Sequence, residues 1–325
     1  MNKPKVYIPN YLPKEIVAYI EKYCTVETWK GEEDGELHKE ELFKLLEDKE
    51  GAILTGMTID DNLLSHAPKL KVVSNIAVGY NNFDLGAMKK RGVIGTNTPG
   101  VLDDSVADLV FSLLLASARR ISELDAYVKA EKWKDSDNEN LFGEDVHHKT
   151  LGIIGMGRIG EAIAKRGKLG FDMEILYCNR NRKPEVEESL GAKYEDLNSL
   201  LSKADFIVLM TPLTKETKGL IGYKEFELMK NTAIFINASR GQTINEAALL
   251  DALLKGKIYG AALDVFENEP INLDNPLLKL PNVITTPHIG TATAKTRFDM
   301  AMQAAENMVK ALTGGTPANV VKELK

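Results

Sequence analysis

The sequence has little cysteine and no long apolar run. Two of its 325 residues are cysteines, Cys24 and Cys178, which suits a reducing cytoplasm better than a disulfide framework. The longest nearly apolar stretch, Leu109 to Ala118, is far shorter than the ~18 residues that a membrane-spanning helix needs. The N-terminal segment has no apolar core of signal-peptide length. We therefore expect a cytoplasmic protein that does not cross a membrane.

The sequence also lacks an excess of positive charge, since 41 Lys and Arg face 47 Asp and Glu and give a net charge of −6. Nucleic acid is therefore not expected as a partner, and an anionic ligand must be bound by a few local groups. Of the five histidines, His147 and His148 are adjacent and His38 and His66 have no helical partner, so no metal site is expected. No repeat or low-complexity segment is visible, which excludes solenoids and propellers.

Short apolar runs alternate with stretches of helical periodicity along the whole chain. This alternation predicts an α/β fold of doubly wound parallel sheets with helices on both faces, and the length suggests about two domains at ~150 residues each. One longer helix is expected from Asp108 to about Lys129, with Asp108 as a capping or structural residue, and a surface loop from Lys134 to His148. The expected strands are 52–54, 71–74, 151–154, 175–177, 206–210, 233–236 and 261–265, and the expected helices are 13–23, 39–46, 161–169, 197–202, 223–229, 246–255 and 293–312.

A glycine motif lies between one of these strands and the next helix. In the run 155–160 we expect Gly155 to allow the tight turn, Gly157 to admit a pyrophosphate, and Gly160 to let helix and strand pack closely. The N–H groups at the helix start can then bind phosphate oxygens. The motif predicts a dinucleotide site, and the alternative is a glycine-rich turn with no ligand.

The segment nineteen residues after Gly160 bears on the choice of cofactor. An NAD site usually carries an acidic residue there for the ribose 2′-hydroxyl, but this sequence has Asn179, followed by Arg180, Arg182 and Lys183. Guanidinium groups suit the 2′-phosphate of NADP. We therefore expect NADP(H) to be preferred, with NAD(H) possible if the basic loop is only solvated surface.

Polar residues stand at the ends of three later strands. Arg240 follows one strand, Asp264 lies within the next with Glu269 just after it, and His288 stands between a proline and an isoleucine. Ligands of open α/β sheets bind at such strand ends. Taken singly, each has an ordinary structural alternative, a packed loop for His288 or a surface ion pair for Arg240.

In this order the motifs resemble the D-isomer-specific 2-hydroxyacid dehydrogenase family over essentially the whole chain. The runs that carry the resemblance are 155–160, 237–241, 264–270 and 287–290, with 78–81 similar to the family's substrate loop and 98–101 similar to its hinge. Within the family, the segment 145–150 and the basic loop look most like bacterial glyoxylate/hydroxypyruvate reductases that also act on 2-ketogluconate.

The resemblance implies two Rossmann-like domains with a cleft between them. The substrate-binding domain would be discontinuous, residues 1–100 plus 290–325, and the NAD(P)-binding domain would be 101–289. The family is typically dimeric through its cofactor domains, which implies a homodimer and would account for the apolar run 109–118.

The resemblance also implies roles for single residues. His288 would donate a proton to the developing alkoxide, Glu269 would orient its ring and stabilise its protonated form, and Arg240 would bind the substrate carboxylate and polarise the carbonyl. The backbone N–H groups of Val78 and Gly79 would complete the anion site, and Asp264 would bond the nicotinamide carboxamide. The full set of expected cofactor contacts is Val106, Gly155, Gly157, Arg158, Ile159, Gly160, Asn179, Arg180, Arg182, Thr211, Pro212, Thr217, Ala238, Ser239, Arg240, Asp264, His288 and Gly290.

The predicted activity is NADPH-dependent reduction of glyoxylate, hydroxypyruvate or 2-ketogluconate to the D-2-hydroxy acid. Two alternatives share the fold: a binding protein that senses dinucleotides, as some relatives do, and an NAD-dependent enzyme similar to phosphoglycerate dehydrogenase. Formate dehydrogenase is also related, but no feature of the sequence favours it.

Overall fold

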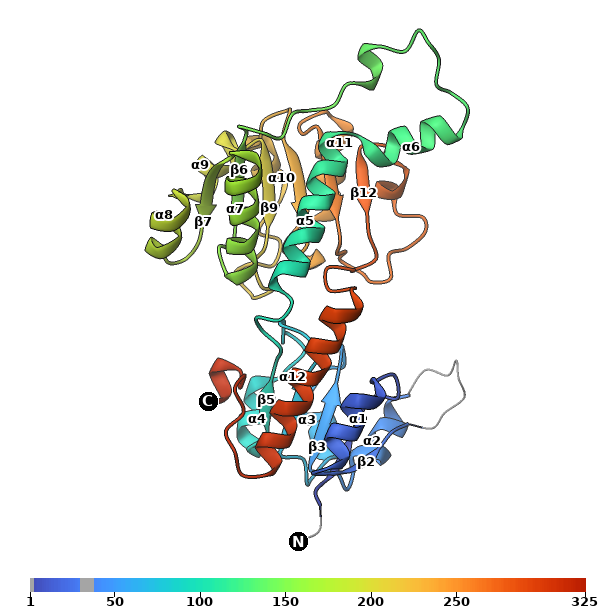
Figure 1. Ribbon diagram of the computed structural model, residues 1–325, viewed down its shortest axis with the longest axis vertical. Coiled ribbons are helices and arrows are strands. Elements are labelled where there is room, and N and C mark those ends of the chain that lie inside the picture. Colours follow the sequence, from blue (N-terminus) through green and yellow to red (C-terminus); the bar gives the residue numbers. More distant parts are fainter. Residues whose placement is uncertain (1–2, 30–37) are drawn as a thin grey trace. The chain divides into compact units, whose positions relative to one another are not determined.

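The computed structural model describes residues 3–29 and 38–325. The chain divides into two compact units, Met1–Leu102 together with Ala292–Lys325, and Asp103–Thr291. The first unit is therefore discontinuous in sequence, because its last helix comes from the end of the chain (Figure 1).

The sheet of the first unit is formed by β1 (Lys5–Tyr7), β2 (Thr25–Glu27), β3 (Gly51–Leu54), β4 (Val72–Asn75) and β5 (Ile94–Thr96). All pairings are parallel, in the order β2-β1-β3-β4-β5, and Val6 pairs with Val26 on one side and Gly51 on the other. Every residue of β3 and β4 is buried, as expected for parallel strands covered on both faces.

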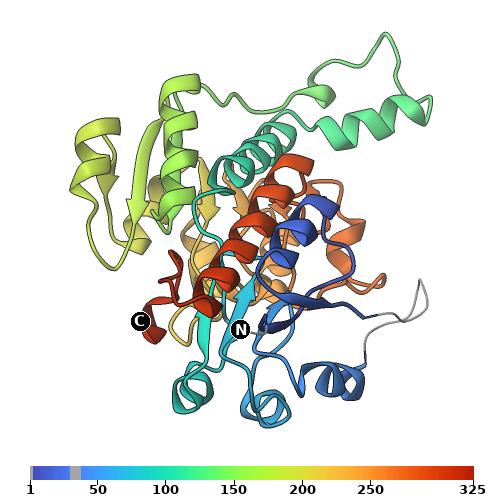
Figure 2. The same cartoon turned by 60° about the horizontal axis from the view of Figure 1, so that its bottom comes forward.

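The helices of the first unit are α1 (Lys14–Glu21), α2 (Lys39–Leu46), α3 (Asp61–Ser65), α4 (Leu85–Arg91) and α12 (Ala294–Leu312). Helix α12 contacts α1 and lies on β3, β4 and β5, so α1 and α12 cover the same face (blue and red in Figure 2). Leu42, Leu64 and Met88, from α2, α3 and α4, share one buried cluster with Val73 of β4. The sheet thus has a helical layer on each face.

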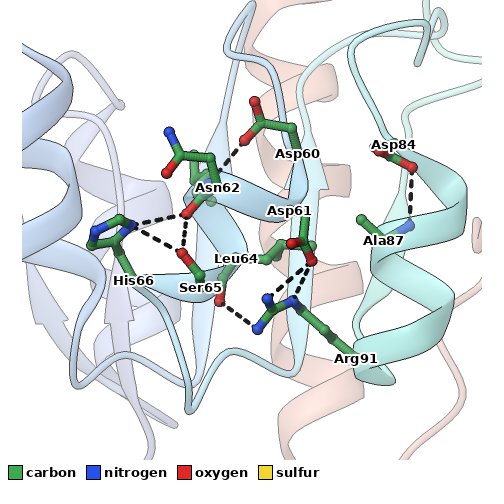
Figure 3. Close-up of polar contacts among 10 residues, drawn as sticks. Asp60, Asp61, Asn62, Leu64, Ser65, His66, Asp84, Ala87 and Arg91 are labelled. Atoms are coloured by element: carbon green, nitrogen blue, oxygen red, sulfur yellow. Dashed lines mark hydrogen bonds and ion pairs between the residues drawn. The ribbon is translucent and has the colours of Figure 1, made fainter.

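Helices α3 and α4 flank the loop that follows β4, and polar contacts fix their ends (Figure 3). Asp60 and Asp84 each accept a hydrogen bond from a backbone N–H in the first turn of the helix that follows. Arg91, the last residue of α4, donates from Nε and Nη2 to Oδ1 of Asp61 at 3.0 and 2.9 Å. These bonds fix the first turns of α3 and α4 and join the end of α4 to the start of α3.

The sheet of the second unit is formed by β6 (Thr150–Ile154), β7 (Glu174–Cys178), β8 (Lys193–Tyr194), β9 (Phe206–Leu209), β10 (Ile234–Asn237), β11 (Gly260–Leu263) and β12 (Val283–Thr285). All pairings are parallel, in the order β12-β11-β10-β9-β6-β7-β8. The direction of the chain across the sheet therefore reverses between β6 and β9. Ligands of doubly wound sheets bind at the carboxyl ends of the strands at such a reversal.

The helices of the second unit are α5 (Asp103–Ala118), α6 (Ile121–Lys129), α7 (Arg158–Phe171), α8 (Pro184–Leu190), α9 (Leu197–Lys203), α10 (Tyr223–Leu228) and α11 (Glu246–Leu254). Helices α5 and α7 lie side by side (Figure 1), while Leu200, Phe226 and Leu249 of α9, α10 and α11 belong to a separate buried cluster. The prediction of an α/β fold with doubly wound parallel sheets is confirmed.

The predicted helix from Asp108 to about Lys129 is wrong at its start and in its middle. The helix begins at Asp103, and Arg120 adopts the left-handed conformation (φ 55°), which ends α5 and starts α6. Asp108 therefore caps no helix end; its Oδ1 accepts from Arg166 of α7 at 2.8 Å. The apolar periodicity continues across the break, so it did not reveal the left-handed residue.

The segment after α6 extends away from the sheet of its unit in both views (green in Figures 1 and 2). Within the predicted loop from Lys134 to His148, residues Glu139–Leu141 form a short 3₁₀ helix. Arg120 binds this 3₁₀ helix and the residue that follows it, since its Nη1 donates to the carbonyl oxygens of Asn140 and Phe142 at 2.7 and 3.0 Å. The residues 119–144 are called the arm from here on.

Two exclusions from the sequence concern membranes and disulfides. In the described ranges, no helix combines the length and the apolar content that crossing a membrane requires. Cys24 and Cys178 are both free thiols.

Candidate active site

The glycine motif forms the turn from β6 into α7. Gly155 has φ 106°, and a Cβ there would lie 2.7 Å from the carbonyl carbon and oxygen of Met210, so both the turn and the packing require glycine. A Cβ on Gly160 would lie 2.5 Å from the carbonyl oxygen of Gly155, which explains the close approach of helix and turn. A Cβ on Gly157 would meet nothing within 4 Å, so space is open beside the first residues of α7.

This end of the sheet fits a dinucleotide cofactor. The first N–H groups of α7, from Arg158 and Ile159, have no carbonyl within the helix to bond, which is the arrangement that binds phosphate oxygens. Thr211 follows β9 on the other side of the reversal, and its buried Oγ1 has no hydrogen-bond partner among the described residues. A bound dinucleotide could occupy the open space at Gly157 and supply a hydrogen-bond partner for the hydroxyl of Thr211.

Asn179, at the end of β7, holds the glycine turn. Its Oδ1 accepts from the N–H of Met156 at 2.8 Å, and its Nδ2 donates to the carbonyl oxygen of the same residue at 3.1 Å. The side-chain amide is therefore occupied by the turn on both of its polar atoms. Asn179 can shape the site while the basic residues after it contact a ligand.

The two arginines of the basic loop differ in their partners. Arg182 makes a bidentate ion pair with Glu187, with Nε at 3.0 Å from Oε1, and its guanidinium lies 5.7 Å from the ring centre of Tyr194. The hydrogen bonds from Arg182 and then from Tyr177 lower the pKa of Glu187. Arg180 is exposed and makes no hydrogen bond or ion pair with a described residue. Only Arg180 of the pair can therefore bind an anion without breaking an existing contact.

Two other predicted cofactor contacts, Thr217 and Ser239 after β9 and β10, already use their hydroxyls in hydrogen bonds within the chain. Thr217 uses its hydroxyl inside its own turn, donating to the carbonyl oxygen of Pro212 at 2.6 Å. Ser239 is 6% exposed, and its Oγ donates to Oδ1 of Asn237 at 2.9 Å. Ala238, which lies between Asn237 and Ser239 in the sequence, is half-buried and has no polar side chain to contribute. These residues shape the edge of the sheet around Thr211.

Arg240 lies on the loop after β10 and is held by its backbone. Its carbonyl oxygen accepts from Nδ2 of Asn237 and from Oγ1 of Thr243, and its Nη1 donates to the carbonyl oxygen of Ser239 at 2.6 Å. Burial lowers the pKa of Arg240, and the negative charge of Glu269 opposes that shift. The guanidinium is thus a partly desolvated cation, which strengthens its attraction for a carboxylate.

Gly241, the residue after Arg240, packs closely against the backbone of the loop that carries Glu269. A Cβ on Gly241 would lie 1.8 Å from the carbonyl carbon of Phe266, so only glycine allows the two backbones to approach this closely. Glu269 lies three residues after Phe266, and its Oε1 accepts from the N–H of Phe266 at 3.0 Å. The position of Glu269 relative to Arg240 is therefore fixed by main-chain packing.

Glu269 and His288 form a hydrogen-bonded pair. Nδ1 of His288 lies 2.8 Å from Oε2 of Glu269, which leaves Nε2 on the far side of the ring for another partner. Burial raises the pKa of Glu269, but the hydrogen bonds from His288 and from Phe266, with the charge of Arg240, bring it below its usual value. Glu269 is therefore a carboxylate at neutral pH, and it can accept a hydrogen bond from Nδ1 of His288.

Asp264 positions the segment that carries His288. It lies directly after β11 rather than within the strand, is 1% exposed, and accepts three hydrogen bonds. The donors are Oγ1 of Thr286 at 2.7 Å and the N–H groups of Ile289 and Gly290 at 2.8 and 3.0 Å. His288 has φ 53°, and these bonds on both sides of it hold that left-handed conformation. The aspartate thus fixes the histidine, whatever else it contacts.

The start of α5 supports the same segment. Oγ of Ser105 donates to the carbonyl oxygen of Gly290 at 3.0 Å, and a Cβ on Gly290 would lie 3.4 and 3.6 Å from the methyl carbons of Val106. Val106 is 6% exposed and packs against this backbone. Ser105 was not among the predicted site residues, since a serine near a helix start is expected to cap it.

The predicted anion loop lies in the first unit, after β4. The carbonyl oxygens of three successive residues are all bonded to the body of that unit: Ala77 accepts from the N–H of Thr98 at 2.9 Å, Val78 from Nδ2 of Asn97 at 2.8 Å, and Gly79 from Nδ2 of Asn75 at 2.9 Å. In a trans peptide the N–H points opposite to the carbonyl.

The N–H groups of Val78, Gly79 and Tyr80 therefore point away from the partners that hold the carbonyls. None of these three N–H groups bonds to another described residue. Successive outward N–H groups form a concavity that binds anions. Val78 and Gly79 were predicted as anion-binding groups but Tyr80 was not, because no signal in the sequence reports which way a peptide plane is turned.

Residues 111–290, more than half of the chain, match the model of the NAD-binding domain of D-isomer-specific 2-hydroxyacid dehydrogenases. The chain belongs to this family. As a member of it, the protein is an oxidoreductase that uses a nicotinamide dinucleotide and a small-molecule substrate.

Named relatives of this dehydrogenase match over nearly its full length. Glyoxylate/hydroxypyruvate reductase B of Escherichia fergusonii is 46% identical over 98% of each chain. Glyoxylate reductase of Thermococcus litoralis is 47% identical over 99% of this chain and 97% of that one. A solved structure of an NADPH-dependent glyoxylate/hydroxypyruvate reductase from Sinorhizobium meliloti, in complex with NADP and malonate, is 29% identical, with a TM-score of 0.86 over 99% and 98% of the chains.

The described part of this dehydrogenase contains no cluster of three or more His, Cys, Asp or Glu that could hold a metal ion. His147 and His148 face single carboxylates, Asp145 and Asp172, at 3.7 and 3.9 Å. The polar groups that the structure does bring together are Arg240, Glu269 and His288 in the second unit.

Proposed function

We propose that this dehydrogenase reduces small 2-oxo acids, glyoxylate and hydroxypyruvate foremost, to D-2-hydroxy acids with NADPH as the preferred cofactor and NADH as a slower one. The observation that carries the proposal is the bonded pair of His288 and Glu269 beside the desolvated Arg240. The names of the relatives from E. fergusonii, T. litoralis and S. meliloti support the choice of acids. 2-Ketogluconate is proposed as a third substrate.

His288, Glu269 and Arg240 each have a defined role in this proposal. Residues 101–289 form the cofactor-binding domain and residues 1–100 with 290–325 the substrate-binding domain, and Arg240 of the former also contacts the substrate. The bound nicotinamide supplies a hydride to C2 of the acid. Arg240 binds the carboxylate and polarises the carbonyl, and Nε2 of His288 gives its proton to the carbonyl oxygen as that oxygen takes up the electron pair of the C=O bond. Glu269 stabilises the imidazolium before this transfer, and the N–H groups of Val78 and Gly79 bind the carboxylate.

The assay for this proposal follows the loss of NADPH absorbance at 340 nm with glyoxylate, hydroxypyruvate, 2-ketogluconate and pyruvate, each repeated with NADH. We expect turnover with the first two acids and a preference for NADPH. A preference for NADH would retain the enzyme class and refute the assignment of the basic loop. Binding of NADPH without turnover of any acid would instead favour a dinucleotide-sensing protein.

The structure sharpens the test of cofactor choice, because the two loop arginines are not equivalent. Arg180→Ala should raise KM for NADPH about tenfold or more, since one charge-assisted contact to phosphate contributes about 1.5–3 kcal/mol, and should leave KM for NADH unchanged. Arg182→Ala removes a pair already made with Glu187 and should change the ratio of the two constants less. Equal effects of Arg180→Ala on NADPH and NADH would show that no 2′-phosphate is bound there.

We further propose that the dehydrogenase is a homodimer in which the arm contacts a second copy. Helix α6 has no buried residue, and the arm exposes Ile121, Val128, Trp133 and Phe142, at 57, 52, 67 and 62%. The run 109–118, in contrast, is largely buried within its own unit, since Val110, Phe111, Leu113 and Leu114 are at most 6% exposed. The apolar surface that a dimer would cover is therefore the arm rather than this run.

Light scattering tests the dimer. We expect the wild-type protein to elute at twice the chain mass of 35.9 kDa and the double variant Trp133→Glu/Phe142→Glu to elute as a monomer. A carboxylate in the centre of an apolar interface costs several kcal/mol, of the order of what a small interface can supply. The double variant Tyr11→Glu/Leu273→Glu, at exposed positions outside the arm, is the control, and a monomeric wild type would refute the assignment.

A further inference from the structure

The side chain of Asn97 is the group that turns the central peptide of the anion loop. Its Nδ2 donates to the carbonyl oxygen of Val78 at 2.8 Å, and this carbonyl belongs to the peptide that carries the N–H of Gly79. The carbonyls on either side are held by other groups: that of Ala77 by the backbone N–H of Thr98, and that of Gly79 by the side chain of Asn75, which is 2% exposed. Among the described residues, the orientation of the Gly79 N–H therefore depends on one half-buried asparagine.

Asn97 is itself held at both of its backbone groups. Its N–H donates to the carbonyl oxygen of Asn319 at 3.1 Å, and its carbonyl oxygen accepts from Nδ2 of Asn307 at 3.4 Å. Asn307, on α12, is 2% exposed and also donates to Oδ1 of Asn319 at 3.2 Å. The C-terminal segment continues this clamp, since Val320 forms an antiparallel bridge with Thr96.

These contacts form one continuous path from α12 and the C-terminal segment, through Asn97, to the carbonyl of Val78. An amide donor held on both sides loses little rotational freedom when it binds a carbonyl, so the peptide is fixed before any ligand arrives. A fixed N–H dipole attracts an anion without first having to reorient. Asn97 lies just after β5, which ends at Thr96, so its side chain is not needed for the pairing of the sheet.

We propose that Asn97 is a positioning residue for the substrate carboxylate: its carboxamide holds the Val78 carbonyl so that the N–H of Gly79 faces the anion. The inference rests on the proposed function, because it assigns a cause to the carboxylate affinity of that loop. The carboxylate is common to all 2-oxo acids and does not change during reduction. Asn97 therefore contributes to binding of the substrate and of the transition state equally, which affects KM and leaves kcat nearly constant.

The test compares Asn97→Ala and Asn97→Asp with the wild type. Asn97→Asp keeps the shape of the side chain but cannot donate to the carbonyl when ionised, so both variants should raise KM for glyoxylate about tenfold, the size expected for one weakened charge-assisted hydrogen bond. KM for hydroxypyruvate should rise by the same factor. KM for NADPH and kcat should each stay within about twofold of the wild type.

Asn282→Ala is the matched control. Nδ2 of Asn282 donates to the carbonyl oxygen of Tyr259 at 2.8 Å, so this change removes a bond of the same kind and length in the other unit. The control should lower thermal stability without raising KM for either acid. The Asn97 variants are compared with it at equal folded fraction, judged by thermal unfolding.

Three results would overturn the inference. Asn97→Asp with the KM of the wild type would show that the donated bond is not needed. A fall in kcat with unchanged KM, or equal changes in KM for glyoxylate and NADPH, would indicate a general structural role. Absence of turnover by the wild-type protein with every acid would remove the proposed function and this inference together, and that result is visible before any variant is made.

Discussion

Replacement of His288 by glutamine should lower kcat for glyoxylate reduction by about 10²–10⁴-fold, the usual contribution of a positioned general acid. Glutamine can still donate a hydrogen bond to Glu269 and fills a similar volume, so the loop that carries it should persist. It has no ionisable proton to deliver to the developing alkoxide. KM for NADPH should change by less than about twofold, because the loss concerns the transition state alone.

His148→Gln is the control for this change. His148 also has a positive φ, 61°, and also faces a carboxylate, Asp172, at 3.9 Å, but it precedes β6 at the opposite end of the strand from the glycine turn. Its substitution should leave kcat at the wild-type value. Near-normal turnover of His288→Gln, measured in single-turnover as well as steady-state assays, would remove His288 from the proposed mechanism.

The conformation of His288 shows what the sequence could and could not tell. The position of His288 after a proline at a strand end did not by itself predict an acid, and its expected role came from the order of the motifs and the family resemblance that they carry. The left-handed backbone that aims the ring, and the three hydrogen bonds through which Asp264 holds that backbone, come from contacts between segments more than twenty residues apart. Strand-end position can be predicted from apolar runs, but the orientation of a side chain depends on partners that no local pattern specifies.

The same distinction explains the errors in the helices. The apolar periodicity from residue 108 onward is genuine, and half of the residues of α5 are buried, as expected for a helix with one apolar face. The periodicity does not report that Arg120 is left-handed, because the cost of that conformation is offset by bonds from its guanidinium to Glu123 and to the arm. Those acceptors lie up to twenty-two residues away, outside the window in which a helical pattern is visible.

Basic residues in the cofactor loop show a further limit of sequence reasoning. Arg180 and Arg182 look equivalent by spacing, but Glu187, at the end of the first turn of α8, takes up Arg182. Helix α8 was not predicted, since its only aliphatic residues are Val186 and Leu190, which are too few to show a period. Both predicted phosphate-binding arginines are exposed, but Arg182 is already paired with Glu187, so Arg180 is the one that we propose to contact the 2′-phosphate.

Arg240→Lys should lower kcat/KM for glyoxylate by about 10²–10³-fold, although it conserves charge. A guanidinium can bond a carboxylate with two parallel N–H groups, whereas an ammonium acts as a single point charge. Loss of one charge-assisted bond to the carboxylate, together with weaker polarisation of the carbonyl, accounts for about 3–4 kcal/mol. Both KM and kcat should change, because the arginine is proposed to act on both groups.

The lysine variant should also acquire a pH dependence that the wild type lacks. Burial lowers the pKa of Arg240, but a guanidinium stays charged throughout the pH range of the assay. The ordinary pKa of lysine is about two units lower than that of arginine. A lysine at the same place is subject to the same desolvation, so it loses part of its charge as the pH rises. The ratio of wild-type to variant kcat/KM should therefore be larger at pH 9 than at pH 7.

Arg91→Lys provides the control, because it makes the same exchange at an arginine that bonds Asp61 in the first unit, where no reacting group is proposed. Its kcat/KM should match the wild type at both pH values. If Arg240→Lys kept more than half of the wild-type kcat/KM at pH 7, a positive charge alone would be sufficient, and the bidentate contact between Arg240 and the substrate carboxylate would be refuted. A ratio that stayed constant from pH 7 to pH 9 would show instead that the loop leaves this cation well solvated, contrary to its burial.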